Sequence, residues 1–168
     1  VGCSVDPGRH SLAGALFHPA LAAVSSFSSP RAWAFALLGI EQYLRAFEGD
    51  RNVQAAGREI AERLMRLFRI TDQPEWPWCE DRVTYCNARL PQALLATGSW
   101  TGDAGMTATG IRSLEWLMAI QRTADGYFAP VGTNGFFERG MTAAVFDQQP
   151  VEACATVSAC MLAFRTTG

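Results

Sequence analysis

Residues 76–92, WPWCEDRVTYCNARLPQ, bring together aromatic rings, carboxylates, an amide and a guanidinium group within one short stretch. Flat apolar faces of sugars stack on indole and phenol rings, while polar side chains at the rim bind the hydroxyls. These residue types therefore predict a carbohydrate site. In the structural alternative, the segment plugs the end of a helical domain, with Trp76 and Trp78 as apolar anchors.

A second polar segment, FDQQPVE at residues 146–152, could face the first one. Glycoside hydrolysis needs two carboxyl groups on either side of the scissile bond. We therefore expect Glu80 or Asp81, opposite Asp147, to be catalytic. The residues expected to bind the substrate are Trp76, Trp78, Tyr85, Asn87, Arg89, Gln92, Gln148, Gln149 and Glu152.

Each of these residues also has a structural alternative. Asp147 could cap the last helix, Arg89 could bridge Glu80 or Asp81, and Glu152 could place its charge in the first turn of a helix. The cost of satisfying so many polar groups in one place favours a ligand over purely structural roles for the whole group.

Composition excludes several classes of chemistry. All fourteen basic residues are Arg, so Schiff-base chemistry, a pyridoxal phosphate linkage and a P-loop lysine are excluded. The two histidines, His10 and His18, lie near the N-terminus and outside any metal motif, so we expect no metal and no cofactor. A net charge of -2 with scattered charges gives no reason to expect nucleic acid or an anionic membrane as partner.

The five cysteines, at positions 3, 79, 86, 154 and 160, form no CxxC pair, and their odd number argues against a complete disulfide framework. Cys79 and Cys86 could bridge, but a reducing cytoplasm is the better expectation. The longest uncharged run, residues 11–30, contains His18 and Pro19 and is too polar for a membrane span. The chain begins with Val, so a leader or a longer upstream region could be missing.

Two kinds of helix alternate along the chain. Residues 31–47 begin with the apolar run AWAFALLGI, 88–97 are rich in Ala and Leu, and 151–165 carry no charge between Glu152 and Arg165. These patterns predict three helices surrounded by protein. Residues 51–69 and 103–121 are amphipathic and should show one face to water. A further helix is expected over residues 10–24, weakened by Pro19. We expect Gly98 to end the fourth helix.

This alternation forms an internal repeat. A proline stands near the start of each buried helix, at Pro30, Pro91 and Pro150, with spacings of 61 and 59 residues. The dipeptide Gly-Asp precedes both amphipathic helices, at 49–50 and 102–103. The unit is thus an αα-hairpin with one inner and one outer helix. Because the inner helices should run parallel, the segments before the three prolines should meet at one end and assemble the site.

Four segments carry a resemblance to a known group of proteins: SPRAWAFALLGIEQYL, WPWCEDRVTYCNARLPQALL, DGYFAPVG and FDQQPVEACA. Over about residues 28–165 the chain resembles uncharacterised bacterial domains that accompany glycosyltransferases in polysaccharide gene clusters. Through them it is similar to the six-hairpin (α/α)6 toroid proteins, which include glycoside hydrolases and sugar epimerases. The motifs are specific for the domain type and not for a reaction. Cys79 replaces an expected aromatic residue, and Cys86 replaces an expected Asp.

The expected fold is therefore all-α: a single domain over 1–168 with about three αα-hairpins, half of an (α/α)6 toroid. Long irregular loops or short β-hairpins should precede the inner helices, with a small hairpin possible within 122–149. Half a ring exposes apolar flanks, so we expect either a homodimer or a fragment of a longer chain.

The expected function is that of a glycoside hydrolase acting on an oligosaccharide or glycoside in the cytoplasm. The first alternative is a sugar epimerase or isomerase on the same fold. By resemblance such enzymes use His as acid and base, and the loops of this chain contain none. The second alternative is a non-catalytic carbohydrate-binding domain that serves a glycosyltransferase.

Overall fold

The computed structural model describes residues 7–168, so Cys3 lies outside the described residues, as does the side chain of His10. The described chain is mostly helical, which confirms the expected all-α class. Its helices and strands, in chain order, are α1 (Pro7–Val24), α2 (Pro30–Leu44), α3 (Arg51–Thr71), β1 (Arg82–Val83), α4 (Arg89–Thr101), α5 (Ala104–Ile120), β2 (Phe137–Glu138) and α6 (Pro150–Thr167).

The prolines and aspartates that were expected to begin helices do so in the structure. Pro30 and Pro150 occupy the first positions of α2 and α6, where a missing N–H costs nothing. The carboxylate of Asp50 accepts a hydrogen bond of 3.1 Å from the Val53 N–H and caps α3. Asp103 caps α5 in the same way through the Met106 N–H, at 3.0 Å.

The expected end of α4 at Gly98 is wrong. The helix continues to Thr101 and ends at Gly102, whose φ of 73° is the left-handed conformation that favours glycine. Gly98 instead allows α4 and α5 to approach closely. A Cβ atom at Gly98 would lie 2.5 Å from the Thr107 hydroxyl and 2.9 Å from its backbone nitrogen.

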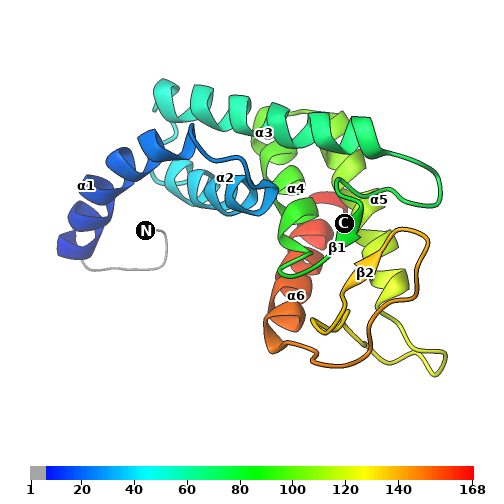
Figure 1. Cartoon of the computed structure of the whole chain (residues 1–168). Helices are drawn as coiled ribbons and strands as arrows, with labels where there is room; N and C mark the ends of the chain where they lie inside the picture. The colour runs from blue at the N-terminus through cyan, green and yellow to red at the C-terminus, as the bar shows by residue number, and fades with distance from the viewer. Residues whose placement is uncertain (1–6) are drawn as a thin grey trace.

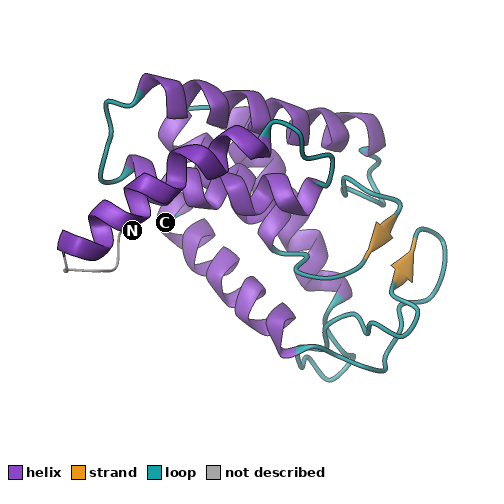
Figure 2. Ribbon diagram, turned by 60° about the vertical axis from the view of Figure 1, so that its left-hand side comes forward, coloured by secondary structure: helices purple, strands orange, loops and turns teal. Residues whose placement is uncertain are grey.

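The core surrounds α4, which packs against α5, α2, α6 and α3 (Figures 1 and 2). Leu90, Ala93, Leu94 and Leu95 are completely buried, as expected for an inner helix. Helices α2 and α6 lie on different sides of α4, and α3 packs on α2. At the other end of the array, α1 packs on α2, where the ring of Phe17 stacks on Tyr43 with 4.1 Å between ring centroids.

The expectation that the last helix is buried all round is wrong. Helix α6 buries one face, made of Glu152, Ala155, Thr156 and Ala159. Its opposite side is exposed because none of the described helices covers it: α6 lies at the edge of the helical array (Figure 2). The amphipathic pattern of α3 is confirmed, since its apolar stripe is buried and most of its charged residues are exposed.

The short strands join two loops that are distant in sequence. Within residues 122–149 the expected small hairpin is reduced to an isolated antiparallel bridge between Arg122 and Phe128. The two strands pair between loops instead: β1, in the loop before α4, pairs antiparallel with β2, in the loop before α6. The side chains of Arg82 and Glu138 form an ion pair across this sheet. The Arg139 N–H extends the contact by donating to the Asp81 carbonyl, at 2.9 Å. The loops before the two inner helices are thereby held side by side.

Candidate functional site

A buried polar network joins the starts of α2, α4 and α6. Arg31 lies in the first turn of α2, Asn87 lies two residues before the start of α4, and Glu152 lies in the first turn of α6. The Arg31 guanidinium donates to the Asn87 side-chain oxygen at 3.2 Å, and the Asn87 amide donates to Glu152 at 3.0 Å. The starts of α2, α4 and α6 therefore meet at one end of the molecule.

Arg31 is the centre of this network, and the sequence reasoning missed it. Its guanidinium also donates to the Glu80 carboxylate and to the Tyr85 carbonyl, both at 2.6 Å, and lies 5.0 Å from the centroid of the Tyr85 ring. A signal was present in the sequence: an arginine opens an otherwise apolar inner helix, and a buried charge needs partners. The partners themselves lie 49 to 56 residues away in the chain.

Glu152 is almost completely buried and acts as an acceptor for the loop before α4. It accepts hydrogen bonds from the backbone N–H groups of Cys86 and Asn87, the latter at 3.2 Å. Cys86 has a φ of 48°, a conformation that few residues other than glycine adopt. Burial, followed by the nearby Glu152 charge, raises the pKa of the Cys86 thiol. Glu152 thus lies in the first turn of α6, as expected, and its carboxylate binds the backbone of the loop before α4.

The two tryptophans of the central loop are part of the core. Trp76 meets Trp116 and Phe137 edge to face, at 4.9 and 5.1 Å between ring centroids. Its indole N–H donates to the Glu80 carbonyl at 2.7 Å. Trp78 is fully buried and contacts Phe68 and Trp116. The two rings hold the loop against the helices, as in the structural alternative, and leave no open face for stacking on a sugar.

The three carboxylates expected to be catalytic have different surroundings. Glu80 is held by Arg31, whereas Asp81, with a side chain that is 84% exposed, pairs with Arg139 at 3.2 Å. Asp147 is exposed, has a φ of 65° and does not cap α6, whose capping position is Gln149. Gln148 and Gln149 are also exposed, and Gln149 donates to the Asp147 carbonyl at 3.3 Å.

A cavity of about 440 Å³ lies between α2, α4 and α6. Two residues that were expected to bind substrate, Arg89 and Gln92, line it from α4. The remaining residues expected at the site do not line it. The other lining residues come from α2 and α6: Leu38, Glu41, Gln42, Arg45, Ser158, Met161, Leu162 and Arg165.

The charges of this cavity are unbalanced. Glu41 is the one carboxylate among its lining residues, and it accepts hydrogen bonds from Arg45 and Gln42. Arg89 donates to the Gln92 side-chain oxygen at 2.7 Å rather than to Glu80 or Asp81. Within residues 7–168, neither Arg89 nor Arg165 forms an ion pair. The positive charges of these two guanidinium groups are therefore not neutralised by a carboxylate of the described protein.

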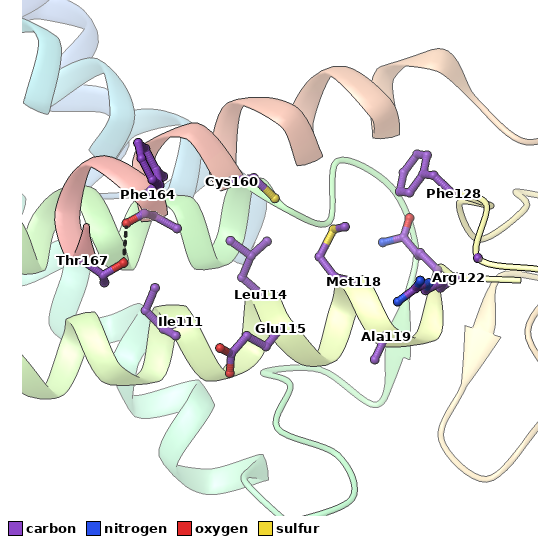
Figure 3. A pocket seen from close by; sticks show the side chains of 13 residues that line it. Ile111, Leu114, Glu115, Met118, Ala119, Arg122, Phe128, Cys160, Phe164 and Thr167 are labelled. Carbon is purple, nitrogen blue, oxygen red and sulfur yellow. Dashed lines mark hydrogen bonds between the residues drawn. The ribbon is translucent and has the colours of Figure 1, made fainter.

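A larger hollow of about 680 Å³ lies between α5 and α6 (Figure 3). Its walls are mainly apolar, with Leu114 and Met118 from α5 and Phe164 from α6. The buried amide of Gln121, also in the wall, finds no hydrogen-bond partner in the described protein. None of the residues expected at the carbohydrate site lies in this hollow, and its chemistry does not resemble that of a sugar site.

Two further features bear on function. Among the described residues, no cluster of three or more His, Cys, Asp or Glu side chains is arranged to hold a metal ion. In the same part of the chain, no helix is both long and apolar enough to cross a membrane.

A comparison of the chain with models of protein families, with curated proteins and with solved structures found no match.

Proposed function

We propose that this chain binds an acidic saccharide in the cavity between α2, α4 and α6. In this proposal α2 with α3 and α4 with α5 are αα-hairpins of a half-toroid, and the inner helices present the cavity on their common inner side. The single observation that carries the proposal is the pair of arginines, Arg89 and Arg165, that line this cavity without a carboxylate partner in the described protein.

The chemistry of the lining fits a sugar that carries a carboxylate, sulfate or phosphate group. A guanidinium group binds such anions through two parallel hydrogen bonds. Gln42, Gln92 and Ser158 can exchange hydrogen bonds with hydroxyl groups. Leu38 and Leu162 offer apolar surface to the C–H face of a ring. At about 440 Å³, the cavity is within the size range of small-molecule sites, about 300 to 1,000 Å³.

The geometry favours binding over hydrolysis. A glycoside hydrolase places two carboxyl groups about 5 to 10 Å apart across the bond that it cleaves. Glu41 is the one carboxylate in the lining of the cavity, and Arg45 and Gln42 already bind it. Hydrolysis by Glu80, Asp81 and Asp147 stays a prediction from the sequence, since these residues line no cavity with Arg89. The non-catalytic carbohydrate-binding domain is the function best supported.

Isothermal titration calorimetry with oligouronates and with neutral oligosaccharides of the same length tests this proposal. We expect binding of the acidic series alone, weakened about tenfold or more by Arg89→Gln or Arg165→Gln, since charged hydrogen bonds contribute about 1.5 to 3 kcal/mol. Arg66→Gln, on the exposed side of α3, is the matched control. Equal binding of the neutral series, or unchanged affinity in both cavity variants, would contradict the proposal.

The same samples decide between binding and turnover. After prolonged incubation, the oligosaccharides are separated by chromatography and new reducing ends are quantified. We expect the acidic oligosaccharide to be recovered intact. Release of shorter products, abolished by Glu80→Gln or Asp147→Asn, would instead support the hydrolase that the sequence predicts.

A further inference from the structure

The array of inner helices ends at both sides in exposed apolar surface. On α6, Val157, Met161 and Phe164 are spaced so that they share one side of the helix, and they are 59%, 51% and 72% exposed. At the other end, Phe35 of α2 is 48% exposed. Surface of this kind, contiguous along a helix, marks a site of interaction with protein.

Equivalent positions of the internal repeat can be compared in α2, α4 and α6, and they differ in burial. The positions four and seven residues after Pro91 are Leu95 and Gly98, both buried, and both lie against α5. The same positions after Pro30, Ala34 and Leu37, are completely buried. After Pro150 they are Cys154 and Val157, and both are exposed. The face of α6 that corresponds to the α5-covered face of α4 is therefore uncovered in the described chain.

On α2, the uncovered face is the one that would pack on a helix earlier in the repeat. Two, five and six residues after the repeat proline, the side chains of α4 and of α6 are all buried, whereas those of α2 are half-buried or exposed. In α6 these positions form the face that packs on the inner helix before it, α4. The corresponding face of α2 is therefore only partly covered in the described chain. The positions are Ala93, Ala96 and Thr97 in α4, Glu152, Ala155 and Thr156 in α6, and Ala32, Phe35 and Ala36 in α2.

From this complementarity we infer that two copies of the chain associate head to tail, with α6 of each copy packed on α2 of the other. A twofold axis forms the contact twice and leaves neither face open. The two copies together supply twelve helices, six inner ones from α2, α4 and α6 and six outer ones from α1, α3 and α5. In this ring, α1 of one copy is the outer helix that follows α6 of the other.

The exposed residues supply most of the area that a stable dimer needs. Next to Phe35, α1 carries Leu12 and Leu16, one turn apart and 61% and 62% exposed. Burial of these three side chains together with the α6 surface, at both contacts, removes on the order of 1,000 Å² of apolar surface. Specific interfaces begin at about 1,200 Å² in total, including polar area at the rim. In the ring the contact also lies beside the cavity, because Met161 of α6 belongs both to the cavity wall and to the contact surface.

Light scattering coupled to size-exclusion chromatography, at about 1 to 100 µM protein, tests the inference, with affinity read from the concentration dependence. We expect a species of twice the 18.3 kDa chain mass. Val157→Asp and Phe35→Asp should each weaken association at least 100-fold, because each places a charge in both contacts. Both residues are exposed in the single chain, so the fold should persist, as circular dichroism can verify. Ile70→Asp, at an equally exposed apolar position on α3, is the control and should remain dimeric.

A mixing experiment separates the head-to-tail arrangement from a contact between two α6 helices. A mixture of the Val157→Asp and Phe35→Asp chains can form a heterodimer in which one contact is fully wild type, so we expect more dimer in the mixture than in either variant alone. Association that is sensitive to Val157→Asp but not to Phe35→Asp would overturn the inference. So would a stable monomer at 100 µM, or open assemblies that grow with concentration.

Discussion

Removal of the Glu152 carboxylate should destabilise the protein far more than a typical helix substitution. Glu152→Ala leaves the backbone N–H groups of Cys86 and Asn87 and the Asn87 side-chain amide without their acceptor in a buried place. Each buried donor without a partner costs about 1 to 3 kcal/mol, and loss of one member of a buried charged network typically costs about 3 to 5 kcal/mol. Glu152→Gln keeps one acceptor oxygen and should cost about half as much.

Urea unfolding at one fixed protein concentration, followed by tryptophan fluorescence, measures this effect. With a slope of about 2 kcal/mol per molar urea, the midpoint of Glu152→Ala should fall by about 1.5 to 2.5 M. The control is Glu115→Ala on the exposed side of α5, for which we expect a change within about 0.5 kcal/mol. A loss below 1 kcal/mol in Glu152→Ala would refute the reasoning, because the loop before α4 would then be held by other contacts.

Two further substitutions probe local features of the fold. Gly98→Ala should destabilise the protein by about 1 to 3 kcal/mol, because its Cβ would collide with Thr107. Gly14→Ala has open space around it and should stabilise α1 by about 0.5 to 1 kcal/mol. Thermal unfolding of both variants measures these changes. The Val53 N–H bond holds the pKa of Asp50 below its usual value, so this carboxylate contributes stability above about pH 4 that is lost as the pH falls further. Asp50→Asn keeps a cap without a titrating group and should lose less stability than the wild type in urea unfolding between about pH 4 and pH 2. Equal acid sensitivity of both proteins would contradict this linkage.

The features that depend on nearby residues could be predicted from the sequence. Pro30 and Pro150 begin helices, and Asp50 and Asp103 cap them, because each acts on backbone groups within one helical turn. The role of Gly98 could not be predicted in this way. A glycine that ends a helix and a glycine that admits a neighbouring helix look alike until the position of α5 is known.

For the candidate site too, some features could be predicted from the sequence and others depend on residues that are distant in the chain. The repeat correctly indicated that the starts of α2, α4 and α6 would meet, and Arg89 and Gln92 do line a cavity. Residue type alone could not show that Trp78 is buried in the core, because a core and a sugar site both favour aromatic rings. The part played by Arg31 was missed since its contacts join residues about 50 positions apart.

The network at the helix starts also bears on how the protein unfolds. In arrays of helical hairpins each unit contacts only its neighbours, so an end unit can detach without disturbing the rest. Here Glu152 of α6 holds the backbone before α4, and Asn87 in turn is bonded to Arg31 of α2. Detachment of α6 would therefore expose donors that belong to the middle of the array. Amide hydrogens in α2, α4 and α6 should therefore exchange through one cooperative opening rather than in succession from the end of α6.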